Sequence, residues 1–103
     1  MDTGSKSTVT FEVDKNMTAD FEGKRIHDVL STFHLVYYAE LAVRKMIEPF
    51  LEDGEEAVGF EINLKHLRPA KIGDRAEVTA TLIKKDGKKL VCEIEAVNSK
   101  EKI

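Results

Sequence analysis

The sequence has little of what several protein classes need. Cysteine occurs once, as Cys92, so no disulfide can form within the chain, and a free thiol favours a reducing, cytoplasmic compartment. No apolar run approaches the roughly 20 residues of a membrane-spanning helix. The first residues, MDTGSKSTVTF, lack the charged-then-apolar order of a signal peptide. We therefore expect a cytoplasmic protein with no membrane partner.

An excess of positive charge and the best-known catalytic signatures are also missing. Sixteen Lys and Arg stand against 19 Asp and Glu, for a formal net charge of −3, so nucleic acid is not an expected partner. There is no G-x-S-x-G elbow, no phosphate-binding glycine loop and no H-E-x-x-H helix. Three scattered histidines and the lack of a C-x-x-C pair make a structural metal site unexpected.

Length and composition fit one small domain. The chain has 103 residues, 42% apolar and 34% charged, which leaves no room for a second domain. We expect a single domain over 1–103, with 1–7 disordered. A domain of this size buries a modest share of its surface, so assembly with further copies is a natural way to add burial.

The pattern of apolar residues predicts an α+β fold. The period is 3.6 in the middle of the chain and 2 elsewhere, and Asp86-Gly87 is a strong hairpin signal. Strands collected after one long helix favour an antiparallel sheet with the helix on one face, in the order β-α-β-β-β. The expected elements are a strand at 8–13, a polar connection at 14–24, a helix at 31–51 capped by Asp28 or Thr32, and strands at 57–67, 76–84 and 88–97.

Glu40 stands out within the predicted helix. At about 100° per residue it falls at the centre of an apolar sector. An ionised carboxylate on a core-facing stripe is costly unless it is paired or keeps its proton, and desolvation would raise its pKa. A partner Lys or Arg, a bend of the stripe into solvent, and a subunit contact are the structural alternatives. The sector consists of Val29, Phe33, Val36, Val43, Ile47 and Leu51.

A second ionisable side chain lies on the sheet face expected to meet this helix. His66 continues the alternate series of Val58, Phe60, Ile62 and Leu64. Alone, such a histidine is more often a hydrogen-bonded core or rim residue. Beside a desolvated carboxylate, it could orient that group or exchange protons with it.

The remaining candidates favour structural interpretations. Cys92 alternates with Leu90 and Ile94, as a small core residue would. Tyr37 and Tyr38 are expected to pack at the edge of the helix stripe, and His34 to face solvent. The lysines around Asp86-Gly87 favour a solvated hairpin tip, with a phosphate-binding patch as the alternative. These lysines are Lys84, Lys85, Lys88 and Lys89.

Three blocks of the sequence resemble a known family. They are VLSTFHLVYYAELA, VGFEINLKHLRPAKIGDRAEVTATL and KKLVCEIEAV, within residues 8–103. Together they are similar to the hotdog-fold thioesterases, in the group typified by fluoroacetyl-coenzyme A thioesterase. The resemblance implies an antiparallel sheet wrapped around one long central helix. Within it, HLRPAKIGD is widespread among hotdog proteins and supports the fold more than any one substrate.

The resemblance also implies site residues. The family's catalytic Thr, Glu and His match Thr32, Glu40 and His66 in type and spacing. Gly59 matches a glycine beside the family's acyl pocket. Phe33 stands where the family usually has proline and is expected, with Val36, to shape the substrate pocket. The family also typically continues past the position of Ile103 into another strand, and without that strand one sheet edge would be open.

The implied reaction is hydrolysis of a small or medium acyl-CoA thioester, with CoA as part of the substrate and no other cofactor. Glu40 would be the nucleophile or a general base on water. Eight residues of helix separate Thr32 from Glu40 by about 12 Å. The resemblance therefore favours a site at the interface of a homodimer, which could assemble further into a tetramer.

Two other functions stay open. A non-catalytic hotdog module would bind acyl-CoA or a related ligand without releasing thiol. A hotdog hydratase would need an Asp and His dyad, for which the sequence offers no convincing aspartate. The acyl group and its carrier, CoA or a carrier protein, are left open.

Overall fold

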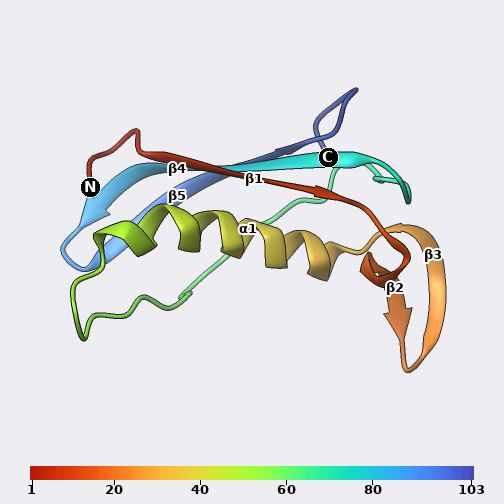
Figure 1. The fold of residues 1–103 in the computed structure, drawn as a ribbon, viewed down its shortest axis with the longest axis horizontal. Coiled ribbons are helices and arrows are strands. Elements are labelled where there is room, and N and C mark those ends of the chain that lie inside the picture. Colours follow the sequence, from red (N-terminus) through yellow and green to blue (C-terminus); the bar gives the residue numbers. More distant parts are fainter.

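The protein is built around a three-stranded antiparallel sheet and one helix. The computed structural model describes all 103 residues. Strands β1 (Lys6–Glu12), β4 (Arg75–Asp86) and β5 (Lys89–Val97) pair in the order β1-β4-β5, and helix α1 (Thr32–Ile47) runs along one face of this sheet (Figure 1). The predicted α+β class is confirmed. No helix has the length and apolar character that crossing a membrane requires.

The sequence pattern located three of the elements well. β4 and β5 are joined by the expected hairpin, in which Asp86 pairs with Lys89 and Gly87 takes a positive φ of 61°. β1 begins at Lys6, two residues before the predicted start, and Lys6 and Ser7 pair with Thr81 and Ala80 of β4.

A second small sheet begins within the stretch predicted as a polar connection and continues to the start of α1. After the 3-10 turn η1 (Lys15–Met17), β2 (Thr18–Phe21) and β3 (Lys24–Leu30) form an antiparallel hairpin that extends beyond the first turn of α1 (Figure 1). The prediction was wrong because most of this hairpin is exposed on both faces, so its side chains do not alternate. Glu22 and Gly23, both with positive φ, form its turn.

Helix α1 is shorter than predicted at both ends. Its N-cap is Ser31, whose hydroxyl accepts a hydrogen bond from the backbone N–H of His34, so both predicted caps, Asp28 and Thr32, were wrong. The α-helix ends at Ile47 and is followed by the 3-10 turn η2 (Glu48–Phe50), which contains Pro49. Proline has no N–H for the next helical hydrogen bond, which explains the change.

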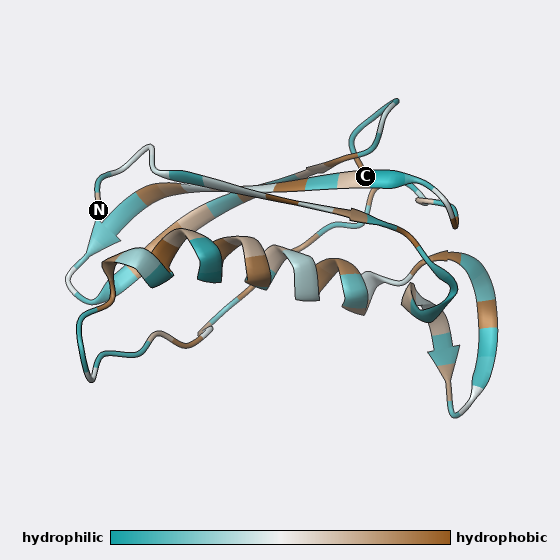
Figure 2. Ribbon diagram, in the orientation of Figure 1, coloured by the Kyte–Doolittle hydropathy of each residue, from teal (hydrophilic) through white to brown (hydrophobic).

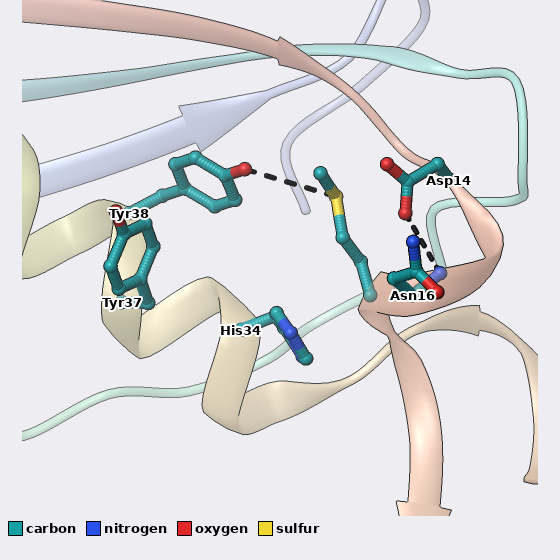
Figure 3. Close-up of a pocket in the computed structure, with 6 residues that line it drawn as sticks. Asp14, Asn16, His34, Tyr37 and Tyr38 are labelled. Atoms are coloured by element: carbon teal, nitrogen blue, oxygen red, sulfur yellow. Dashed lines mark hydrogen bonds between the residues drawn. The ribbon is translucent and has the colours of Figure 1, made fainter.

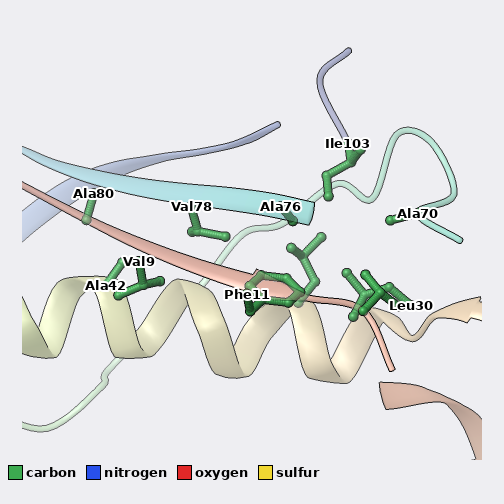
Figure 4. Close-up of a cluster of buried hydrophobic side chains, with 11 residues drawn as sticks. Val9, Phe11, Leu30, Ala42, Ala70, Ala76, Val78, Ala80 and Ile103 are labelled. Carbon is green, nitrogen blue, oxygen red and sulfur yellow. The ribbon is translucent and has the colours of Figure 1, made fainter. Parts of the chain in front are cut away.

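The helix buries a different face from the one predicted. The sector centred on Glu40 is largely exposed or half-buried, and only its member Ile47 is buried. Figure 4 shows the main core between α1 and the sheet, and Figure 2 shows hydrophobic and hydrophilic bands alternating along α1. Small side chains such as Ala42 and Ala80 let the helix approach β4 closely. A prediction based on the positions of large apolar residues gives such alanines too little weight. The buried helix residues are Leu35, Ala39, Ala42, Met46 and Ile47.

The segment 57–67, predicted as a strand, is not one in this structure. It follows η2 and passes along α1 in an irregular path (Figure 1). Residues 57–66 take part in no backbone hydrogen bond, and Val58 and Phe60 are 87% and 83% exposed. Alternation encodes which side chains share a face, whereas a strand also needs a neighbour to pair with. The structure therefore has two strands after the helix instead of three.

Ile103 ties this segment to the sheet. Its N–H donates to the carbonyl of Ala96 at 2.9 Å and its carbonyl accepts from the N–H of Leu67 at 2.8 Å. Ile103 is also buried, at 3% exposure. The C-terminal end of the segment is thus fixed beside β5, close to His66.

Candidate active site

Thr32 and His66 meet at the first turn of α1. The Thr32 hydroxyl Oγ1 lies 3.0 Å from Nδ1 of His66, a hydrogen bond that joins the helix start to the end of the 57–67 segment. The Ser31 cap positions Thr32, and the Leu67–Ile103 hydrogen bond positions His66. We call these two residues the Thr32–His66 pair. It borders a shallow hollow of about 290 Å³, whose other lining residues include Ala19, Val29, Leu30 and Leu67.

The imidazole of His66 has one nitrogen engaged and one free. Nε2 is buried and has no hydrogen-bond partner. Burial lowers the pKa of His66 below its ordinary value of 6.5, so the ring is neutral near pH 7. In a neutral ring one nitrogen donates and the other accepts. If Thr32 donates to Nδ1, Nε2–H is a donor; if Nδ1–H donates to Thr32, Nε2 is an acceptor.

Glu40 lies elsewhere, against Gly59. A Cβ built on Gly59 would be 3.4 Å from Oε1 of Glu40, so the backbone of the 57–67 segment passes directly beside the carboxylate. We call this the Glu40–Gly59 contact. Glu40 is exposed, and its carboxylate takes part in no hydrogen bond or ion pair. The desolvation that the sequence pattern predicted for Glu40 is absent in a single copy of the chain.

Arg44, one helical turn after Glu40, holds the start of the segment. Its guanidinium forms ion pairs with Glu48 and with Glu56, and the same Glu56 carboxylate accepts the N–H of Ala57 at 3.1 Å. The hydrogen bond from Arg44 lowers the pKa of the Glu56 carboxyl and raises that of Arg44. We call the Arg44–Glu56 ion pair the clamp. Sequence reasoning missed it, because only the Arg44–Glu48 spacing marks a helical pair.

The two residues expected to shape the substrate pocket lie outside the hollow at His66. Phe33 is half exposed and makes an edge contact with the ring of Phe21, at 6.2 Å between centroids. Val36 is half-buried. With Glu40 they follow the i, i+3, i+7 spacing of one helix face, so they lie on the Glu40 side of α1.

His27 and Arg68 also line the hollow, and the sequence analysis did not select them. Arg68 donates to the carbonyl of Lys102 at 2.9 Å and pairs with Glu101 at 3.3 Å, so its charge is already matched. The one sequence feature that could have pointed to Arg68 is its position two residues after His66.

A second hollow, of about 300 Å³, lies on the β1 side of the helix start (Figure 3). Three of its polar side chains already have partners: Asp14 accepts from the N–H of Asn16, Tyr38 donates to the sulfur of Met17, and His34 bonds to Ser31. The ring of Tyr38 stacks on Phe11 at 3.7 Å, which confirms packing for this tyrosine. His34 is half-buried, so its predicted exposure was wrong.

The Thr32–His66 pair and the Glu40–Gly59 contact are therefore separate features of one chain. Thr32 and Glu40 are separated by eight residues of a continuous α-helix, about 12 Å along its axis. No cluster of three or more His, Cys, Asp or Glu side chains is placed to hold a metal ion.

Comparison with known proteins adds to this geometry. The family model of FlK, fluoroacetyl-CoA-specific thioesterase, matches residues 13–103. No curated protein sequence matches the chain. A hypothetical protein from Thermus thermophilus, described as a thioesterase superfamily member, is 36% identical with a TM-score of 0.92, covering 97% of this chain and 74% of that one.

Two further solved structures are similar. A variant of FlK in complex with fluoroacetate and CoA has 27% identity and a TM-score of 0.92, covering 100% of this chain and 87% of that one. A hot-dog-like protein from Thermanaerovibrio acidaminovorans, at 18% identity and a TM-score of 0.89, covers 98% of this chain and 75% of that one and supports the fold alone. The chain therefore has a hotdog fold and belongs to the FlK family of fluoroacetyl-CoA-specific thioesterases.

Proposed function

We propose that this protein hydrolyses a small or medium acyl-CoA thioester to a carboxylic acid and free CoA. The observation that carries the proposal is the hydrogen bond between Thr32 and Nδ1 of His66 at the edge of a hollow, where burial keeps the imidazole neutral near pH 7 and Nε2 has no partner. Family membership supports the reaction class, and variants of FlK have been solved with acetyl-CoA and with fluoroacetate and CoA. The acyl group of the present substrate is not assigned.

In this proposal Glu40 is the nucleophile. Its carboxylate attacks the thioester carbonyl, the C–S bond breaks, and CoA leaves as a thiolate that takes up a proton. The resulting mixed anhydride on Glu40 is then hydrolysed by water, which regenerates the carboxylate and releases the acid. The alternative role for Glu40 is a general base that activates water for direct attack. An exposed carboxylate without an ion-pair partner suits either role.

His66 and Thr32 would act on the carbonyl side of the thioester. With Nδ1 accepting from the Thr32 hydroxyl, Nε2–H would donate to the carbonyl oxygen and stabilise the developing oxyanion once the thioester displaces the groups that bury Nε2 in the single chain. The backbone beside Gly59 lies close enough to Glu40 to contact the same substrate.

We further propose that each site is assembled from two copies of the chain. The Thr32–His66 pair of one copy would meet the Glu40–Gly59 contact of the other, because one straight helix keeps them about 12 Å apart. A two-fold axis brings residue i of one copy to residue j of the other, and j to i, so one interface would complete two sites. Half-exposed Phe33 and Tyr37 share the helix face of Glu40 and would supply apolar contact area.

The test is thiol release from a panel of short and medium acyl-CoA substrates, with native protein and Glu40→Gln at equal folded concentration. We expect release by the native protein and a loss of about 10²–10⁴-fold in the variant. Glu48→Gln is the matched control, because it removes an exposed carboxylate eight residues further on, directly after α1. Binding of acyl-CoA without thiol release by the native protein would favour the non-catalytic module instead.

A further inference from the structure

The hairpin at 84–89 concentrates positive charge on an acidic protein. Its four lysines and one aspartate give +3, and since the whole chain is −3, the remaining residues sum to −6. None of the five ion pairs in the structure involves a hairpin lysine. Lys85 donates to the carbonyl of Met1 at 2.6 Å, while Lys84, Lys88 and Lys89 remain exposed. Unpaired charge of one sign on a hairpin tip attracts anions.

An exposed aromatic ring lies beside these charges. The ammonium of Lys89 is 5.2 Å from the ring centroid of Phe60, which is 83% exposed. In the β4–β5 register Lys84 pairs with Val91, and Asp86 with Lys89, so Lys84, Asp86 and Lys89 share the sheet face opposite Leu90 and Cys92. A ring face next to ammonium groups can stack on a base and pair with its phosphates.

This surface lies within reach of the proposed catalytic carboxylate. Phe60 directly follows Gly59, the residue that contacts Glu40. Gly59, beside the Glu40 carboxylate, and Phe60, beside the Lys89 ammonium, are therefore adjacent residues of the 57–67 segment. The hairpin also lies at the C-terminal end of α1 (Figure 1), where Leu90 and Cys92 pack against the buried cluster that contains Met46 and Ile47. From Glu40 to Ile47 the helix rises about 10 Å.

We propose that Lys84, Lys88, Lys89 and the ring of Phe60 bind the adenosine 3′-phosphate 5′-diphosphate end of the acyl-CoA substrate. The inference rests on the proposed function and gives the substrate a direction: the nucleotide lies at the hairpin, the flexible pantetheine arm follows α1, and the thioester reaches Glu40. It also favours CoA over a carrier protein as the acyl carrier, because a carrier protein has no adenine to stack on Phe60.

The test compares the double variant Lys84→Gln/Lys89→Gln, and separately Phe60→Ser, with native protein. The control is Lys24→Gln/Lys100→Gln, which removes the same charge at exposed positions away from the hairpin. Kd is measured by calorimetry for adenosine 3′,5′-bisphosphate, adenosine and inorganic phosphate. KM and kcat are measured for one acyl group carried on CoA and on N-acetylcysteamine, which lacks the nucleotide.

We expect the hairpin variant to raise Kd for the bisphosphate and KM for acyl-CoA by about tenfold, with kcat and the N-acetylcysteamine substrate unaffected. Phe60→Ser should weaken the binding of adenosine as well as bisphosphate. Unchanged constants, an equal change in the control, or equal affinity for inorganic phosphate and the bisphosphate would overturn the inference. Thiol release with an unchanged KM would sink only the nucleotide site, whereas lysine-dependent binding without thiol release would sink only the hydrolysis.

Discussion

The two halves of the proposed site differ in how much of their environment one chain supplies. The Thr32–His66 pair has a hydrogen bond, a capped helix start and a partly buried imidazole. The Glu40–Gly59 contact has an exposed carboxylate with no hydrogen bond, and its neighbouring segment forms no backbone pairing at 57–66. The first half is complete within one copy, and the second is open toward another molecule. The following predictions test this difference in order of decreasing expected effect.

Removing the imidazole should have the largest effect. His66→Asn deletes the Nε2 side of the ring, so we expect thiol release to fall by about 10²-fold or more with little change in KM. His27→Asn is the control, because His27 lines the same hollow but has no bond to Thr32. If His66→Asn and His27→Asn lose the same amount of activity, the loss comes from changing the hollow and not from breaking the Thr32–His66 pair.

Adding a methyl group at the second half should have a smaller effect. In Gly59→Ala the new Cβ lies at 3.4 Å from Oε1 of Glu40, close enough to restrict how substrate approaches the carboxylate. We expect kcat/KM to fall by about tenfold. Asn63→Ala, on the same segment, should leave kcat/KM unchanged. Full activity in Gly59→Ala would mean that the reacting atoms do not pass between Glu40 and Gly59.

Breaking the clamp should weaken the second half indirectly. Arg44→Gln frees Glu56 and with it the start of the segment that carries Gly59. Exposed ion pairs contribute little, so kcat/KM should fall by only about three- to fivefold. Glu48→Gln keeps the clamp and should have native kcat/KM, and Arg44→Lys should recover part of the loss. If Glu48→Gln and Arg44→Gln behave alike, the clamp has no positioning role.

The lowered pKa of His66 predicts a small pH dependence of stability. Near and below pH 6.5 the unfolded chain takes up a proton that the folded chain resists, so the free energy of unfolding should decrease as pH falls from 6.5 to the folded pKa. Above pH 6.5 this contribution should be constant. His66→Asn should lose this component, measured as the difference between native and variant denaturation midpoints from pH 8 to pH 5. Parallel curves for the two proteins would show that His66 is not desolvated.

Sequence reasoning recovered the fold where side chains face a core within one chain. The first eight residues of β4 alternate between buried and more exposed side chains because one face packs on α1, and Asp86-Gly87 marks the turn into β5. The β2–β3 hairpin was missed because few of its side chains are buried, so its sequence shows no alternation of apolar and polar residues. The 57–67 segment has the alternation of a strand but no pairing partner at 57–66, and pairing cannot be read from one segment.

For the site, the sequence supplied residues but not their surroundings. The resemblance selected Thr32, His66, Glu40 and Gly59, and the structure brings them together as two pairs instead of one cluster. Periodicity placed Glu40 in the core, which was wrong. The larger apolar side chains near Glu40, such as Phe33, lie on the half-exposed face of α1, whereas alanines form much of its buried face. The clamp depends on how the loop after η2 folds back, which no local pattern encodes.

The central claim is that the two halves come from different copies, and mixing two inactive variants tests it most directly. Glu40→Gln and His66→Asn are purified separately, then unfolded together and refolded so that their subunits exchange. In a mixed dimer one site has both native halves and the other has neither, so random mixing predicts recovery of about a quarter of the native thiol release. Mixed dimers that form, as mass spectrometry would show, but release no thiol would contradict the claim and place both halves within one copy.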